Sequence, residues 1–213
     1  MKKNVIEFFN SSELVDYKKS IQLMEKRVEN IKKKKQSELL WFLEHPSIYT
    51  AGTSSKDKDL LNDNLFPVIK TNRGGQFTYH GPGQIVCYPI FDLENFFTDI
   101  HKYLRTLEFI VVKTLKKFGI VSMGSEDHTG VWIDKGTTNE RKICALGIKA
   151  SRWVTKHGLA LNVNTDLSYF DGIIPCGLKG KAVTSMNKEI GREVNKDEVI
   201  EELVKQFEKE FKN

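Results

Sequence analysis

A single cysteine on a constrained bend is the first residue in this sequence that could act chemically. Cys176 stands between Pro175 and Gly177 in the segment DGIIPCGLKGK, residues 171–181. Proline fixes its own φ and glycine adopts backbone angles closed to other residues, so we expect Cys176 on a bend rather than inside a helix or strand. A thiol at such a place is either a small apolar filler beneath a loop or a nucleophile, and the local sequence leaves both interpretations open.

Lys142 is the second residue whose position could support such chemistry. It opens the expected strand KICALGIKA, and period-two alternation predicts that four residues share one face of it: Lys142, Cys144, Leu146 and Ile148. A lysine followed on its own face by apolar residues points toward a core or cleft, where its pKa would be perturbed. The alternative is a lysine at the strand end whose amine reaches water.

The most unusual composition lies in RGGQFTYHGPGQ, residues 73–84, which has four glycines, an arginine and a histidine. Glycines let a backbone approach a ligand closely, and their amides can donate hydrogen bonds. The segment has neither the GxxxxGK[ST] pattern of a P-loop nor a GxGxxG that opens a helix, so both nucleotide fingerprints are missing. We predict a ligand-binding loop; the alternative is a wide hairpin turn in which Arg73 and His80 satisfy backbone carbonyls.

The segment GLALNVNTD, residues 158–166, is a third candidate contact region, because glycine and alanine inside a strand leave room for a ligand. The alternative is ordinary packing of small residues in a sheet. The five histidines show no metal-ligand spacing on one helix, and no cysteine lies near them in a known zinc pattern. We therefore expect no metal site.

Composition and charge restrict the class of protein. The 213 residues, 39% hydrophobic and 29% charged, are enough for one domain with a sizeable core. No run is long and apolar enough to span a bilayer, and the start MKKNVIEFFNSSEL is a poor secretory signal. Three cysteines without a CxxC pattern argue against a disulfide framework. We expect a cytoplasmic protein with reduced thiols and no membrane association.

A lysine tract at residues 32–35 contributes to the net charge of +5. Such a tract at the end of a helix is usually a solvated face, and it could also meet an acidic partner. The aromatics nearby, Trp41 and Phe42, lie in an apolar run typical of a core rather than of a stacking platform, so we expect no nucleic-acid partner.

The predicted elements place strands between helices. Apolar residues at helical spacing predict helices over 13–33 and 99–118 and from Asn195 onward, the first capped by Ser11 or Ser12. Strands are expected over 39–43, 67–71, 85–91, 130–134, 142–150 and 158–163. The helix–strand alternation of a doubly wound parallel sheet is missing. The predicted fold class is therefore α+β, a mixed or antiparallel sheet flanked by helices in one domain over 1–213, with a small second lobe from Val183 as an alternative.

Three ordered segments resemble the lipoyl(octanoyl) transferase family: EHPSIYTAG at 44–52, RGGQFTYHGPGQIVCYPIFDL at 73–93 and KICALGIKASRWVTKHGLALNVNTDLSYFDGIIPCGL at 142–178. The resemblance implies a fold like that of biotin and lipoate protein ligases. It implies an enzyme that takes octanoate from octanoyl-acyl carrier protein and forms an acyl-thioester on a cysteine. The acyl group would then pass to a lysine of the lipoyl domains of 2-oxoacid dehydrogenase complexes or of the glycine cleavage H protein.

The resemblance also assigns roles to residues. The nucleophilic cysteine falls on Cys176, and the lysine that lowers its pKa falls on Lys142. The acyl-contacting positions fall in three runs: Arg73, Gly74, Gly75, Gln76, Phe77, Thr78, Tyr79 and His80; Ala145, Leu146 and Gly147; Gly158, Leu159 and Ala160. Cys144 departs from the family, where small residues are usual, and could be a second acylation site. No cofactor is implied, because exchange between thioesters needs no ATP.

Two alternatives remain open from the sequence. An ATP-dependent lipoate–protein ligase would need no cysteine nucleophile and would need a more positively charged phosphate-binding loop. A non-catalytic module that binds carrier or lipoyl domains would use the basic surface for acidic partners. Modification of a lipoyl domain by ATP and free octanoate, without acyl carrier protein, would favour the ligase, whereas binding without turnover would favour the module.

Overall fold

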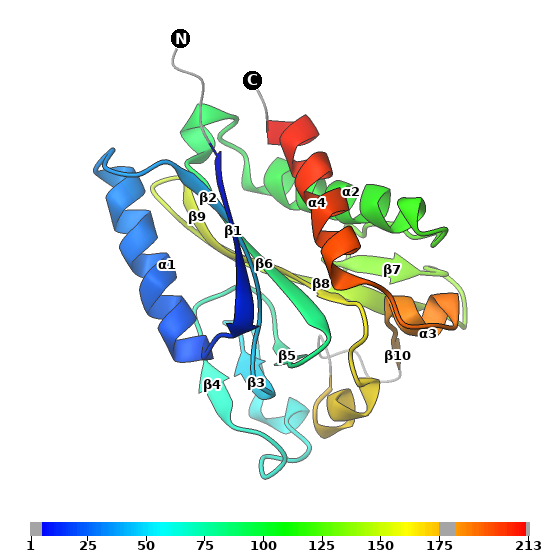
Figure 1. The fold of residues 1–213 in the computed structure, drawn as a ribbon. Helices are drawn as coiled ribbons and strands as arrows, with labels where there is room; N and C mark the ends of the chain where they lie inside the picture. The colour runs from blue at the N-terminus through cyan, green and yellow to red at the C-terminus, as the bar shows by residue number, and fades with distance from the viewer. Residues whose placement is uncertain (1–5, 175–181, 212–213) are drawn as a thin grey trace.

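A seven-stranded mixed sheet forms the centre of the molecule (Figure 1), as seen in a computed structural model that describes residues 6–174 and 182–211. The order of six strands across the sheet is β1 (Ile6–Leu14), β2 (Glu38–Glu44), β6 (Gln84–Ile90), β9 (Val154–Asn162), β8 (Arg141–Ser151) and β10 (Ala182–Val183). The seventh strand, β7 (Val131–Ile133), pairs with β8 outside this order. The pairs β1–β2 and β8–β10 are parallel and the others antiparallel. The predicted α+β class with a mixed sheet is confirmed.

A second, three-stranded sheet lies at one end of the large one (Figure 1). Its order is β4 (Val68–Lys70), β3 (Ile48–Ala51) and β5 (Phe77–His80). The helices are α1 (Tyr17–Lys32), α2 (Ile100–Lys117), α3 (Met186–Ile190) and α4 (Lys196–Phe211), with short 3₁₀ turns η1 (Asp57–Asp59), η2 (Leu93–Asn95) and η3 (Leu167–Gly172).

Two strands occupy segments that the sequence pattern misassigned. β1 covers residues predicted to cap or begin the first helix, and Asp16, rather than Ser11 or Ser12, accepts the capping hydrogen bond from Lys19 N at 3.0 Å. β1 is an edge strand whose side chains are largely exposed, so it lacks a clean alternation and depends on pairing with β2. β3 lies in EHPSIYTAG, a segment outside the expected strands, and pairs with β4 and β5.

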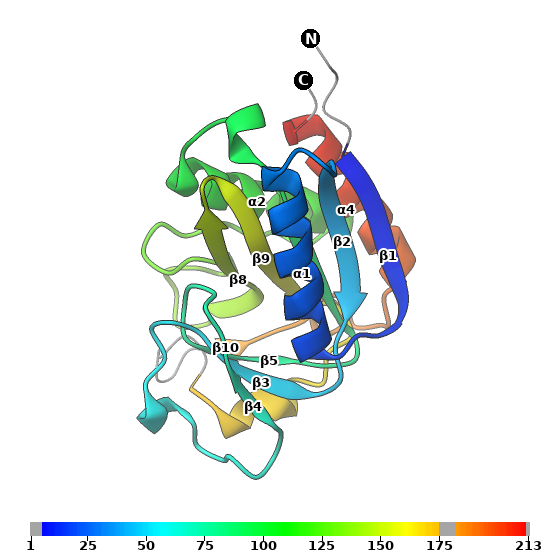
Figure 2. The ribbon, with the colours of Figure 1, turned by 90° about the vertical axis from the view of Figure 1, so that its left-hand side faces the viewer.

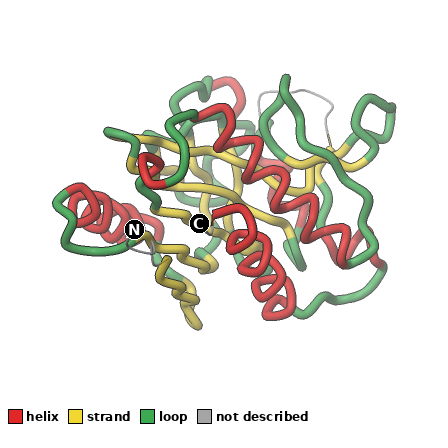
Figure 3. Tube along the Cα trace, turned by 90° about the horizontal axis from the view of Figure 1, so that it is seen from above, coloured by secondary structure: helices red, strands yellow, loops and turns green. Residues whose placement is uncertain are grey.

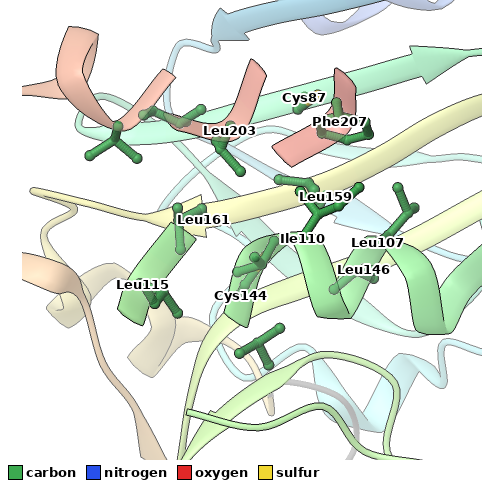
Figure 4. Packing of buried hydrophobic residues seen from close by; sticks show 14 of the residues in the cluster. Cys87, Leu107, Ile110, Leu115, Cys144, Leu146, Leu159, Leu161, Leu203 and Phe207 are labelled. Carbon is green, nitrogen blue, oxygen red and sulfur yellow. The ribbon is translucent and has the colours of Figure 1, made fainter. Parts of the chain in front are cut away.

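The helices divide the large sheet into two faces (Figures 2 and 3). α2 and α4 pack together on one face, which we call the helix-pair face, and α1 lies across β9 and β6 on the other, the pocket face. Alternate residues of one strand therefore reach different cores: Cys87 packs under α2 and α4, whereas Val86 and Tyr88 pack under α1. Because Leu203 and Phe207 of α4 join the core of α2 (Figure 4), the described C-terminal segment shares this core.

Candidate functional site

A pocket forms where the segments expected to contact a ligand come together. It lies between the start of α1, strand β5 with the loop before it, and the pair β8–β9. The space that protein atoms leave empty there, open solvent included, is about 450 Å³. The lining residues are Tyr17, Arg73, Gln76, Phe77, Thr78, His80, Val86, Tyr88, Ala145, Leu146, Gly147, His157, Gly158, Leu159 and Ala160.

Glycines let the glycine-rich loop lie directly on the sheet. Gly74 N donates to Ile148 O at 2.9 Å, so the loop is bonded to the main chain of β8. A Cβ at Gly147 would lie 2.7 Å from Gly74 O, closer than real Cβ atoms come to main-chain oxygens. Gly75 has φ +86°, a conformation that favours glycine. These glycines are therefore required by close approach, as the composition of the segment predicted.

Arg73 holds this loop in shape. Its side chain is buried, and Nη2 donates to Thr50 O at 2.7 Å and to Gln76 O at 2.7 Å, while Nη1 donates to Gly74 O at 3.0 Å. Each of these acceptors is a main-chain carbonyl. The guanidinium therefore ties the loop to β3, which is a structural use of the charge.

Most of the expected contact residues line the pocket, but three do not. Gly74 and Gly75 shape the loop without lining the pocket. Tyr79 packs in an aromatic cluster with Tyr49, and its hydroxyl lies 2.9 Å from Ser47 Oγ. The remaining expected residues of the three runs all line the pocket.

Buried aromatic and histidine side chains surround His80 at the pocket wall, and the sequence did not point to its neighbours Tyr17, His45 and Tyr88. Tyr17 stacks on His80 at a centroid distance of 5.7 Å, and His45 lies behind them at 5.6 Å from His80. His45 Nε2 meets the Tyr88 hydroxyl at 2.8 Å, and its Nδ1 donates to Val15 O at 2.6 Å. Burial lowers the pKa of His45 to about 4 and holds the pKa of His80 well below its usual value.

His157 is the most strained residue of this wall. It is almost fully buried and has φ +60°, a conformation uncommon for residues other than glycine. Its Nε2 lies 3.0 Å from Asn72 Oδ1, and its Nδ1 is buried without a hydrogen-bond partner. Burial lowers the pKa of His157 to about 3. A local signal for this residue is absent from the sequence, because both the burial and the backbone angle depend on the β8–β9 pairing.

Lys142, near the start of β8, does not line this pocket and is 6% exposed. Its Nζ donates to Thr129 O at 3.0 Å and sits 4.5 Å from the centre of the Trp132 ring. A Cβ at Gly130 would lie 3.0 Å from Lys142 Cε, so a glycine makes room for the lysine. Glu108 of α2 accepts from Gly130 N at 2.8 Å and so fixes this loop.

Lys142 and Cys144 do not share a face, so that prediction is wrong. Trp132 pairs with Lys142 and Val131 with Cys144, which leaves Ile143 as an extra residue in a β-bulge. Because Val131 and Trp132 are consecutive, their partners face opposite sides of the sheet. Cys144 therefore enters the helix-pair core (Figure 4), where it has no exposed surface, and burial raises the pKa of its thiol. A buried thiol in this state is a poor acylation site.

Cys176 and its neighbours Pro175 and Gly177 lie outside the described residues, but both flanks of the segment are described. On one side Ile174 N donates to Asp59 O at 2.7 Å. On the other side β10 pairs with β8, placing Val183 opposite Lys142, and Thr184 N donates to Lys142 O at 2.9 Å. Five residues lie between Cys176 and Ala182 in the sequence, and a fully extended chain from one to the other would span at most about 20 Å.

Over residues 6–174 and 182–211, no cluster of three or more histidine, cysteine or acidic side chains is arranged to hold a metal ion. None of the helices described there combines the length and apolar character needed to cross a membrane.

Solved structures share this fold. An archaeal bipartite lipoate protein ligase from Thermoplasma acidophilum aligns over 96% of this chain and 82% of its own, with a TM-score of 0.68 and 19% identity. A lipoate-protein ligase A bound with ATP aligns over 96% and 85%, with a TM-score of 0.68 and 18% identity. A biotin protein ligase from Aquifex aeolicus aligns with a TM-score of 0.53 over 98% and 69%, at 13% identity. The expected ligase-like fold is confirmed.

Sequence relatives are much closer. A protein named octanoyltransferase from Flavobacterium psychrophilum is 51% identical over 92% of this chain and 90% of its own. Another so named, from Anaplasma phagocytophilum, is 47% identical over 97% and 99%. The family model described as lipoyl protein ligase A/B catalytic domain matches residues 16–208. The chain belongs to the lipoyl protein ligase A/B catalytic-domain family.

Proposed function

We propose that this protein is an octanoyltransferase that modifies lipoyl domains. The observation that carries the proposal is the 47% identity to an octanoyltransferase over 97% of this chain and 99% of that protein. The pocket supports it, because its walls include apolar and small residues suited to an acyl chain: Val86, Ala145, Leu146, Leu159 and Ala160.

The proposed donor is octanoyl-acyl carrier protein, and the proposed nucleophile is Cys176. Its thiolate attacks the thioester carbonyl of the donor, the carrier thiol leaves, and a new thioester forms on Cys176. One thioester replaces another, so no ATP is consumed. An ordinary thiol is only a few per cent thiolate at neutral pH, with a pKa near ~8.5. A nearby cation favours the thiolate, and Lys142, held on the strand beside β10, is the proposed source of that charge.

In the second step the lysine amine of the acceptor attacks the Cys176 thioester carbonyl, an amide forms and the bond to the Cys176 sulfur breaks. The attacking amine must lose a proton, and we propose that Lys142 relays this proton from the amine to the departing sulfur of Cys176. The proposed acceptors are lipoyl domains in general, with those of 2-oxoacid dehydrogenase complexes and the glycine cleavage H protein as specific candidates. The proposed location is the cytoplasm, where the thiols stay reduced.

The site offers less to an ATP-dependent ligase. Arg73 is the one arginine or lysine among the described lining residues, and its donors hold Thr50, Gly74 and Gln76 main-chain oxygens. A phosphate-binding site needs donors aimed at the ligand.

Intact-protein mass spectrometry tests the proposal. The protein is mixed with octanoyl-acyl carrier protein, mapped by peptide, and then mixed with an apo lipoyl domain. We expect one octanoyl group on Cys176, discharged to the lipoyl lysine. An octanoyl group on Cys144 would show that Cys176 is not the nucleophile. Modification that needs ATP and free octanoate would show that the protein is a ligase rather than a transferase. Absence of any adduct or product would favour a binding module.

A further inference from the structure

A chain of buried side-chain amides determines which ring nitrogen of His80 carries its proton. Gln84 Nε2 lies 3.1 Å from Tyr79 O and 2.9 Å from Asn162 Oδ1. A main-chain carbonyl can only accept, so the nitrogen of the Gln84 amide must face Tyr79 O. The Gln84 oxygen is then the atom 2.8 Å from His80 Nδ1, and Nδ1 must donate to it.

Asn162 makes this assignment consistent from the other end. Its Nδ2 donates to Thr184 O at 2.9 Å, so its Oδ1 faces Gln84. Each amide is thus anchored by one main-chain carbonyl and cannot be flipped without setting two oxygens against each other. Both amide side chains are almost fully buried, where an unmet donor or acceptor costs roughly 1–3 kcal/mol.

The surroundings of His80 keep its other nitrogen free of a proton. Burial, His45 and the Arg73 charge together hold the His80 pKa well below its usual value. His80 lines the pocket, whereas Gln84 and Asn162 do not, so the Nδ1 edge of the ring faces away from the pocket. Among the described residues, His80 Nε2 has no hydrogen-bond partner.

We propose that Gln84 is a positioning residue, which fixes the His80 proton on Nδ1 and leaves a bare Nε2 facing the acyl pocket as a hydrogen-bond acceptor. His80 is then unable to donate to the oxygen of the thioester, and oxyanion donors must come from elsewhere. Its role is to accept from an N–H of a substrate. This role in transfer rests on the proposed function, whereas the position of the proton does not.

Long-range ¹H–¹⁵N correlation of the histidine rings in the full-length protein at neutral pH tests the proton position directly. The His80 signals are assigned by their loss in His80→Asn. We expect a neutral ring with the proton on Nδ1. A ring with the proton on Nε2, or with both nitrogens protonated, overturns the proposal without reference to activity.

Gln84→Leu tests the positioning role. We expect its His80 spectrum to lose the pure Nδ1–H pattern and kcat/KM for octanoyl transfer to fall about tenfold. Asn162→Leu, which removes the anchor of Gln84, is the second variant and should act in the same direction. Thr114→Val is the matched control, because it removes a buried hydroxyl that donates to Ile110 O on the helix-pair face. We expect wild-type kcat/KM from it.

The outcomes separate this proposal from the proposed function. If the spectrum of Gln84→Leu changes while its kcat/KM stays at the wild-type value, Gln84 has no positioning role. If wild type transfers no octanoyl group at all, the proposed function fails, and the positioning role fails with it, while the ring spectrum still decides where the proton lies.

Discussion

The two faces of the large sheet are built from the same strands but bury different kinds of side chain. The helix-pair face is packed with aliphatic and phenylalanine side chains, among them Leu107, Leu161 and Phe207. The pocket face buries Tyr17, Tyr88 and three histidines around the pocket. Apolar packing on the helix-pair face therefore stabilises the fold, whereas the pocket face holds buried histidines neutral at a cost in stability. Two of the three cysteines, Cys87 and Cys144, fall on the helix-pair face.

The largest expected effect is on octanoyl transfer, and it should differ between substitution of Cys176 and substitution of Cys144. Cys176→Ala should abolish the octanoyl adduct and lower kcat/KM by roughly a thousandfold or more, since removal of a nucleophile leaves only binding effects. Cys144→Ala should keep the adduct and wild-type turnover, because its thiol is buried under α2 and α4. Mass spectrometry and steady-state rates check both. Loss of the adduct in Cys144→Ala with Cys176 intact would contradict the division between the faces.

Truncation on the helix-pair face should cost stability instead. Phe207 is 1% exposed and packs against Phe91 and Phe211 at centroid distances of 6.2 and 6.1 Å. Phe207→Ala should lower the free energy of unfolding by about 3–5 kcal/mol. Urea unfolding measures the loss, and kcat/KM at a temperature where the variant is folded should be unchanged. Phe109→Ala, at an exposed position of α2, is the control and should have little effect.

The neutral histidines of the pocket face should make stability depend on pH. His45 has a pKa of about 4 in the folded protein against about 6.5 unfolded, so the unfolded chain binds more protons between these values. The stabilisation is present above pH ~6.5 and is lost as pH falls toward 4, by about 3 kcal/mol in all. Unfolding free energies from pH 7 to 4 measure the slope. His45→Gln should flatten it, whereas the exposed His101→Gln should not; equal slopes in all three proteins would count against this account.

Removing the positive charge of Lys142 should change the pH titration of the Cys176 thiol. Lys142→Ala should raise the pKa of Cys176 and slow acylation about tenfold or more, because the local positive charge is gone. Thiol alkylation rates against pH measure the shift. Lys149→Ala is the matched control, since Lys149 is exposed on the same strand. A profile in Lys142→Ala identical to wild type would remove this lysine from the proposed role.

The smallest expected effect lies at the hairpin tip that joins β8 to β9, outside both faces. Arg152 and Trp153 have φ of +49° and +63° in a two-residue turn between Ser151 and Val154. Such turns favour Asn-Gly, and the left-handed region costs other residues about 1–2 kcal/mol each. The double change Arg152→Asn, Trp153→Gly should raise the free energy of unfolding by about 1–2 kcal/mol and leave octanoyl transfer unchanged. A lower free energy of unfolding would show that the packing of the Trp153 side chain stabilises the fold by more than its backbone strain costs.

The sequence by itself determined the helices with strong apolar periodicity, the fold class and the segments that meet in the pocket. Arg73 could be singled out because its segment is unusually rich in glycine and polar residues, and Gly158 because a glycine inside a strand is unusual. Gly147 was reached only through the family resemblance. The family resemblance rested on the same segments. Because these features depend on residues near one another in the sequence, they can be predicted without knowing the tertiary contacts.

Only the tertiary structure decided which side chains face which environment. The bulge at Ile143 sends Lys142 and Cys144 to opposite faces, and a regular alternation could not predict it, because a bulge depends on the partner strand. β1 and β3 form because β2 and β5 offer them hydrogen bonds, and their own patterns are weak. The neutral state of His45, His80 and His157 likewise depends on burial by distant segments, which no single stretch of sequence encodes.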